Sequence, residues 1–319
     1  MLDVTVSNTG NETITVFKGH TVLSGAATGN LDIVTENGTD IPYSGLFIRY
    51  QKNNVSKDMF ETFEPGESIA TTINVAQTRK LDNVTRASLS VKQKFRYVLG
   101  DEAPSSIDTM TKCPTVTSQN ITITPEQATV KRDHISSRVP ATNHLSKRDG
   151  LTIDSCTDAQ VTSLKTTVGK VKTQAQSAYT ASLSTKYYWT TWFKSTSVQS
   201  KVESIYKKVV NVESIDPIIS CTDKYDACSG AMLYATQDSN FICVCSGHGY
   251  WDLDEYAADC DSSDYDRVGS VLHEMTHLFG TSDHAYGRDD CLDLSATEAA
   301  DNADTYELYM ESNRLGGCK

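Results

Sequence analysis

The sequence of 319 residues lacks several features that would place it in common protein classes. It contains no apolar run near the roughly 20 residues that a membrane-spanning helix needs, so we expect no contact with a membrane. Positive charge is not in excess, because 29 Lys and Arg stand against 41 Asp and Glu. A net charge of −12 repels nucleic acid. The first residues contain no basic and apolar leader, and we expect that a signal peptide has been removed.

Cysteine is nearly absent from the first 148 residues, where only Cys113 occurs. We interpret Cys113 as an unpaired or buried thiol rather than a thiolate that blocks a metal. The other eight cysteines are Cys156, Cys221, Cys228, Cys243, Cys245, Cys260, Cys291 and Cys318. An even set predicts up to four disulfides and an oxidising compartment, although the sequence alone fixes no pairing. A zinc ribbon at Cys243 and Cys245 is disfavoured, because structural zinc sites separate paired cysteines by two to four residues.

The composition changes near two dibasic pairs, Lys131-Arg132 and Lys147-Arg148. Residues 149–319 contain 13 Lys and Arg against 26 Asp and Glu, a net charge of −13, whereas residues 1–148 contain 16 and 15. A field of this sign attracts basic peptides, or it serves solubility alone. We therefore predict two domains, 1–148 and 149–319. We expect a processing protease of the kexin type to cleave the chain between them, after Arg148.

The first domain alternates apolar and polar residues between Gly, Asn and Pro, which predicts strands. The predicted strands lie at 3–7, 13–17, 46–50, 68–75 and 119–124, and they fit a small antiparallel β-sandwich. Five glycosylation sequons begin at Asn11, Asn37, Asn54, Asn83 and Asn120. Their clustering before residue 148 is compatible with display in a secretory lumen.

The second domain changes to a helical pattern. Apolar residues recur at spacings of three and four over 157–182 and 197–210, which predicts two helices. Apolar segments within 217–250 predict a small sheet, and Ser295 with Glu298 forms a capping box at the start of a last helix that we expect to reach residue 313. The domain is therefore predicted to be α+β, mainly helical.

Within this domain, His273 and His277 flank Glu274 in a His-Glu-x-x-His pattern. Residues four apart share one face of a helix, so both imidazoles can bind a single ion while Glu274 points toward the same space. The alternative, two histidines in an apolar core, is weaker. A catalytic zinc site needs a third protein ligand and one position open to water. Gly280 lets the chain reverse after the helix, so that the carboxylate of Asp283 can reach the metal.

The segment from Gly280 to Gly287 matches a Gly-Thr-x-Asp-x-x-Tyr-Gly motif, and here the chain resembles the deuterolysin, or aspzincin, family of secreted fungal metallopeptidases. The resemblance implies a zincin-like catalytic domain behind a propeptide, with one zinc ion. His273, His277 and Asp283 would be its ligands, Glu274 the general base and Tyr286 the residue that stabilises the oxyanion. The loop before Asp283 is shorter than in the family, and His284 is the alternative ligand.

The resemblance also extends to the last helix, where Asn302-Ala-Asp-Thr-Tyr306 matches a family segment. In the branch that cleaves before lysine, a glutamate follows the aspartate after three residues, as Glu307 follows Asp304 here. Two carboxylates can bind an ammonium group by charge and hydrogen bonds. Without the resemblance, the pair would be read as a solvated helix face. The disulfides implied by the family are Cys156–Cys221, Cys228–Cys245 and Cys260–Cys318, which leaves Cys243 for Cys291.

Together these patterns predict a secreted, monomeric zinc endopeptidase that acts on basic protein or peptide substrates and prefers lysine after the scissile bond. One alternative is a metzincin-like endopeptidase without a lysine pocket, because His-Glu-x-x-His-x-x-Gly-x-x-Asp also resembles that pattern. It would need a methionine below the zinc histidines, and Met310 is a poor candidate inside the last predicted helix. The other alternative is a secreted, catalytically silent glycoprotein, which would be expected to lack a ligand or the base.

Overall fold

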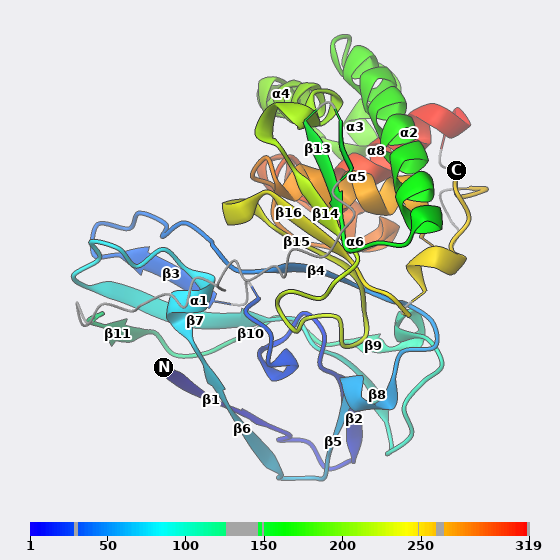
Figure 1. The fold of residues 1–319 in the computed structure, drawn as a ribbon. Helices are drawn as coiled ribbons and strands as arrows, with labels where there is room; N and C mark the ends of the chain where they lie inside the picture. The colour runs from blue at the N-terminus through cyan, green and yellow to red at the C-terminus, as the bar shows by residue number, and fades with distance from the viewer. Residues whose placement is uncertain (29–30, 126–145, 149, 248, 260–264, 318–319) are drawn as a thin grey trace. The chain divides into compact units, whose positions relative to one another are not determined.

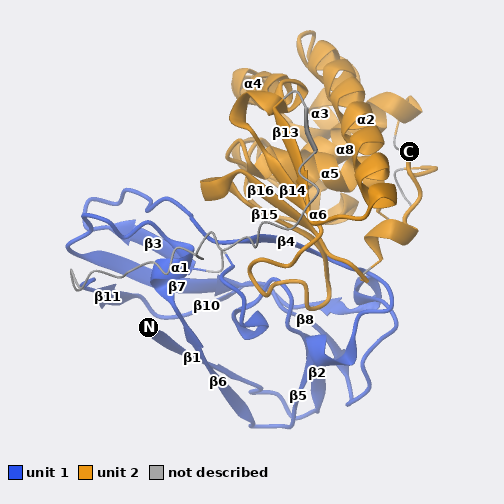
Figure 2. Cartoon of the chain, viewed as in Figure 1, with its two compact units in different colours: residues 1–138 blue, residues 139–319 orange. Residues whose placement is uncertain are grey.

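The structure is a computed structural model that describes residues 1–28, 31–125, 146–148, 150–247, 249–259 and 265–317. The chain divides into two compact units, Met1–Arg138 and Val139–Lys319 (Figure 2). The processing pair Lys147-Arg148 lies in a strand assigned to the second unit. The domain boundary after Arg148 stays a prediction. Among the described residues, every helix is too short or too polar to cross a membrane.

Most of the regular elements of the first unit are strands, and these pair in antiparallel sheets. Its elements are β1 (Leu2–Ser7), β2 (Ile14–Phe17), β3 (Leu31–Thr35), β4 (Phe47–Tyr50), β5 (Phe60–Phe63), β6 (Ser68–Ile73), α1 (Val75–Thr78), β7 (Ala87–Gln93), β8 (Arg96–Leu99), β9 (Thr111–Lys112), β10 (Val116–Thr117) and β11 (Ile121–Ile123). The strand orders are β1-β6, β5-β2-β8-β9 and β10-β7-β11, and β3 also pairs with β7.

Alternation in the sequence explains how these strands pack. Successive side chains of a strand point to opposite sides, so one face of β1 carries Leu2, Val4 and Val6. They pack on a buried cluster that includes Leu31 and Leu89 from β3 and β7. The prediction of a strand-rich first domain is confirmed by these elements. Its description as a β-sandwich stays a prediction.

The second unit has mixed helix and sheet content (Figure 1). Its strands are β12 (Ser146–Arg148), β13 (Leu151–Asp154), β14 (Ile218–Ser220), β15 (Ala231–Thr236) and β16 (Phe241–Val244). Within the unit they follow the order β12-β13-β14-β16-β15, with β13, β14 and β16 parallel and the outer pairings antiparallel. This is the small sheet that the sequence predicted.

The helices of the second unit are α2 (Asp158–Ser182), α3 (Trp189–Trp192), α4 (Gln199–Val210), α5 (Arg267–His277), α6 (Arg288–Leu292), α7 (Ala296–Ala299) and α8 (Ala303–Leu315). The long helix α2 begins at a capping box formed by Thr157 and Gln160. It packs against α4, α5 and α8, and α5 also contacts β15. Helix α5 therefore lies in the core of the unit, and all its residues from Val268 to His277 are buried.

The single helix predicted from Ser295 to residue 313 is instead broken into α7 and α8. The break has a physical reason at Asn302, which forms a bridge with Ser282. The side-chain carbonyl of Asn302 accepts hydrogen bonds from the backbone N–H groups of His284 and Ala285, at 2.8 and 2.9 Å. The hydrogen bonds from Asn302 thus fix the loop after α5. They stabilise the interrupted form over a helix that continues through Asn302.

Among the described residues, Cys156–Cys221 and Cys228–Cys245 form disulfides, and both match the pairs that the family resemblance implied. The expected pair of Cys243 with Cys291 is wrong, because both are free thiols. Cys243 lies on β16 beside Cys228, whereas Cys291 on α6 accepts a hydrogen bond from the Asn302 amide at 3.3 Å. The expected pair Cys260–Cys318 lies outside the described residues. Cys113 is also free.

Candidate metal centre

The candidate centre is built on α5, whose start is fixed by Asp266. This buried carboxylate accepts hydrogen bonds from the backbone N–H groups of Gly269 and Ala257. It is the N-cap that the sequence pattern left undefined. One turn apart on the helix, His273 and His277 are fully buried and direct their Nε2 atoms toward each other at 3.1 Å. The i, i+4 spacing therefore brings the two imidazoles together, as predicted.

The ring of His277 is oriented by the backbone just beyond the helix. Its Nδ1 lies 3.0 Å from the carbonyl oxygen of Thr281. A carbonyl can only accept, so Nδ1 donates this hydrogen bond, and when the ring is neutral its lone pair is on Nε2. Gly280 permits the turn that brings Thr281 back, because its φ is +96°. The sequence did not reveal this contact, since a backbone carbonyl has no signature in the side-chain pattern.

Asp283 completes a triangle of donor atoms with the two histidines. Its Oδ1 lies 3.3 Å from His273 Nε2 and 3.2 Å from His277 Nε2. Burial alone would raise the pKa of Asp283, but the charges and hydrogen bonds of His277 and His273 hold this pKa well below its usual range. The shortened loop therefore still delivers this carboxylate to the histidines.

The donor triangle has the dimensions of a zinc site. Bonds of about 2.0–2.1 Å in a tetrahedron place neighbouring ligand atoms about 3.3 Å apart. The three separations here are 3.1, 3.2 and 3.3 Å, all between buried or nearly buried atoms. Two imidazoles and a carboxylate are also a donor set that zinc prefers in catalytic sites. The residues present therefore fit a bound zinc ion.

His284, the alternative ligand, lies elsewhere. Its Nε2 is 2.9 Å from the carboxylate of Asp301, and its side chain is 37% exposed. Asp301 also forms an ion pair with Lys201. His284 thus belongs to a surface cluster of charges, and the described groups able to hold a metal include His273, His277 and Asp283 without it.

Glu274 follows His273 on α5, and Tyr286 lies against the His273 ring. Glu274 is fully buried on α5, and its charge contributes to raising the pKa of Cys243 on β16. The Tyr286 ring stacks on His273, with ring centroids 6.1 Å apart. Burial, followed by the charge and hydrogen bond of Asp283, raises the pKa of Tyr286 well above its usual value. The phenol therefore keeps its proton and can donate a hydrogen bond.

The acidic residues of α8 lie behind His273 rather than in solvent. Asp304 Oδ1 is 2.8 Å from His273 Nδ1, and its Oδ2 accepts a hydrogen bond from Gly287 N at 2.6 Å. Glu307 Oε2 is 3.8 Å from the same Nδ1, beyond hydrogen-bond distance. The two side chains are only 3% and 5% exposed. The expectation that they share one helix face is confirmed, and this face turns toward the histidine.

Two comparisons with known proteins agree with this geometry. Residues 178–311, which include the whole donor triangle and both α8 carboxylates, match the aspzincin family model, described as lysine-specific metallo-endopeptidase. Over 99% of its length, the chain is 26% identical to a neutral protease 2 homolog of Arthroderma gypseum and covers 88% of it. It is also 26% identical, again over 99% of its length, to a probable neutral protease 2 homolog of Arthroderma benhamiae, covering 86%.

Proposed function

We propose that the chain is a member of the aspzincin family of zinc metallo-endopeptidases and that it hydrolyses peptide bonds at a zinc ion held by His273, His277 and Asp283. The observation that carries this assignment is the donor triangle, whose separations of 3.1–3.3 Å match a tetrahedral zinc site. Three protein ligands leave the fourth position of such a site for water, as catalysis requires.

In this proposal Glu274 is the general base. When bound, zinc would lower the pKa of a water molecule and polarise the substrate carbonyl. The Glu274 carboxylate takes the proton from the attacking water and later gives it to the leaving amine. Its position on the helix turn between the two histidines, buried from bulk water, supports this role.

Tyr286 is proposed to stabilise the oxyanion that forms at the carbonyl. Its hydroxyl hydrogen-bonds to Asp283, and its raised pKa keeps it protonated. When Asp283 serves as a metal ligand instead, this hydroxyl can donate its proton to the oxyanion, and a hydrogen-bond donor at that position favours the transition state. The stacking of Tyr286 on His273 fixes the ring that presents this hydroxyl.

We assign different roles to the two α8 carboxylates. The Asp304 carboxylate lies 2.8 Å from His273 Nδ1, and we propose that this charge favours the tautomer that presents Nε2 to the metal, which makes Asp304 a positioning residue. Glu307 contributes negative charge on the same face of α8 and is proposed, together with Asp304, to favour lysine after the scissile bond. The description of the family as lysine-specific supports this preference.

A matched pair of variants separates these two roles. Asp304→Asn is expected to weaken zinc binding about 10–100-fold, the usual effect of removing a partner of a ligating histidine. Glu307→Gln is expected to retain zinc and to lose selectivity for lysine over uncharged residues. Zinc content and the residues at the cleaved bonds of one denatured protein, read for both variants, check this. Equal zinc affinities in the two variants would contradict the division of roles.

The activity itself is tested by digesting a denatured protein mixture with the secreted enzyme, with and without a zinc chelator. We expect chelator-sensitive cleavage on the amino side of lysine. Chelator-sensitive cleavage without this preference would retain the peptidase and exclude the lysine pocket, as the metzincin-like alternative predicts. No cleavage by folded, zinc-loaded enzyme would instead favour the silent glycoprotein.

We further propose that the protein is secreted as a zymogen whose propeptide, residues 1–148, is removed after Arg148. The pair Lys147-Arg148 lies in β12, which pairs with β13 at the border of the sheet. An extended segment of this kind suits a processing protease, because peptidases commonly bind substrates as an added strand. The first residue of the secreted enzyme, expected to be Asp149, is read from the preparation used for the digestion.

A further inference from the structure

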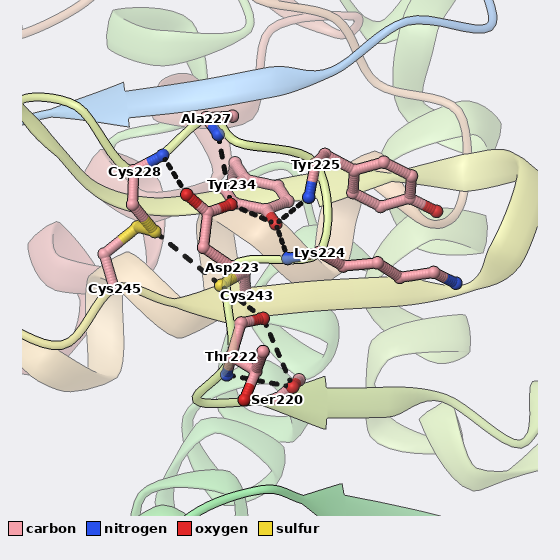
Figure 3. Close-up of a disulfide and its surroundings, with 10 residues drawn as sticks. All are labelled: Ser220, Thr222, Asp223, Lys224, Tyr225, Ala227, Cys228, Tyr234, Cys243 and Cys245. Atoms are coloured by element: carbon pink, nitrogen blue, oxygen red, sulfur yellow. Dashed lines mark hydrogen bonds between the residues drawn. A yellow bond between two sulfur atoms is a disulfide. The ribbon is translucent and has the colours of Figure 1, made fainter. Parts of the chain in front are cut away.

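A third cysteine lies beside one of the disulfides (Figure 3). Cys243 and Cys245 are two residues apart at the end of β16, so their side chains share one face of the strand. Cys228 forms its disulfide with Cys245, and its sulfur also lies 3.8 Å from the sulfur of Cys243. All three sulfur atoms lie within 4.8 Å of one another.

The loop that carries Cys228 is held by polar contacts as well as by its disulfide. The carboxylate of Asp223 accepts hydrogen bonds from the backbone N–H groups of Ala227 and Cys228, at 3.0 and 2.9 Å. Tyr234 on β15 donates its hydroxyl to the same carboxylate at 2.9 Å. That hydroxyl also accepts from the backbone of Lys224 at 3.0 Å. Cys228 therefore stays near β16 whichever cysteine it is bonded to (Figure 3).

We propose that Cys228, Cys243 and Cys245 form a thiol–disulfide exchange site, in which Cys228 is bonded alternately to Cys245 and to Cys243. The Cys243 thiol loses its proton, and its sulfur forms a bond to Cys228 Sγ. The bond between Cys228 and Cys245 breaks, and the Cys245 sulfur leaves with the electron pair and takes up a proton. No outside oxidant or reductant is needed, because one disulfide and one thiol are present before and after.

The two isomers are close to balanced in chain entropy. The disulfides join residues 17 and 15 positions apart, and the cost of closing a loop depends only weakly on its length. Packing of the two buried sulfur positions on β16 therefore decides which isomer prevails. The exchange changes which cysteine at the end of β16 is bonded to the Cys228 loop. Strand β16 pairs with β15, and β15 contacts the active-site helix α5.

Burial makes the exchange slow at neutral pH. It raises the pKa of Cys243 to about 12, with further raising contributions from the charges of Asp223 and Glu274, while a hydrogen bond from Tyr234 lowers it. Only the thiolate attacks a disulfide, so below this pKa the exchange rate should rise about tenfold for each pH unit. Acid should stop the exchange and preserve the populations for analysis.

The test uses the full chain before residues 1–148 are removed, incubated between pH 7 and 9 and then quenched in acid. Free thiols are trapped with a maleimide after denaturation in acid, and peptides are mapped without reduction. We expect label on Cys245 and a linked Cys228–Cys243 peptide, both appearing about tenfold faster per pH unit. Label that stays on Cys243 and never appears on Cys245 at any pH would overturn the proposal.

Two variants exclude other sources of label. Cys243→Ser should give no labelled Cys245 at any pH, because the attacking thiol is gone. Cys113→Ser removes a more exposed free thiol and should leave the exchange unchanged. If Cys245 is labelled equally in Cys243→Ser, the disulfide opens by another route and the exchange site is rejected. The outcome does not depend on zinc or on peptidase activity.

Discussion

Glu274→Gln is expected to lower kcat about 10²–10⁴-fold, the range over which a positioned general base contributes. The amide has the shape of the carboxylate but cannot take a proton from the attacking water. Glu274 is fully buried between His273 and His277, and a replacement of equal size preserves the packing of α5. The zinc content of the variant should therefore equal that of the wild type, and KM should change little.

The measurement combines kcat on a fluorogenic peptide with zinc per chain by mass spectrometry. Glu203→Gln on α4 is the matched control, because it makes the same chemical change at a partly exposed position outside the centre. It should keep full activity. If Glu274→Gln retained wild-type kcat with zinc bound, another group would have to act as the base. If it lost zinc, the variant would report on the metal site rather than on proton transfer.

The local part of the centre could be predicted from the sequence. The positions of His273, Glu274 and His277 follow from helix periodicity, which needs only neighbours along the chain. Gly280 indicated the reversal after the helix, and the structure gives it a positive φ of 96°. Strands β1, β2, β4, β6 and β11 and the long helix α2 were also predicted, because alternation and helical spacing are local patterns.

Contacts between distant segments could not be predicted in this way. Asp304 and Glu307 were identified as a pair on one helix face, but periodicity does not say what that face meets, and it meets His273. Asn302 binds a loop 18 residues earlier in the chain. Helix propensity does not register this contact, so it predicted one continuous helix where the structure has two. Free Cys243 and Cys291 were wrongly paired because a count of cysteines contains no distances.

The family motif supplied what periodicity could not at Asp283. Spacing alone left two candidates, since Asp283 and His284 are neighbours and either side chain is a zinc ligand in other proteins. The backbone of the loop decides between them. Asn302 binds the N–H of His284, the His284 ring then faces Asp301, and the Asp283 carboxylate faces the histidines. Substitutions at Asp283 and at His284 should therefore differ in their effects on zinc binding.

Asp283→Ala is expected to weaken zinc binding by more than about 100-fold, whereas His284→Ala should leave it unchanged. Loss of an outer partner already weakens metal binding about 10–100-fold, and Asp283 is in the donor triangle itself. His284 contributes a surface ion pair with Asp301, so its removal should lower the free energy of unfolding by less than about 1 kcal/mol.

Zinc affinity is measured by competition with a chromogenic chelator, and circular dichroism confirms that each variant is folded. Peptidase activity of Asp283→Ala should return only at zinc concentrations raised in proportion to the lost affinity, because a water molecule is a weaker third ligand than a carboxylate. The reverse pattern, in which His284→Ala loses zinc and Asp283→Ala retains it, would assign the third ligand to the histidine. The loop would then have to turn by one residue when the metal binds, releasing the hydrogen bond from His284 N to Asn302.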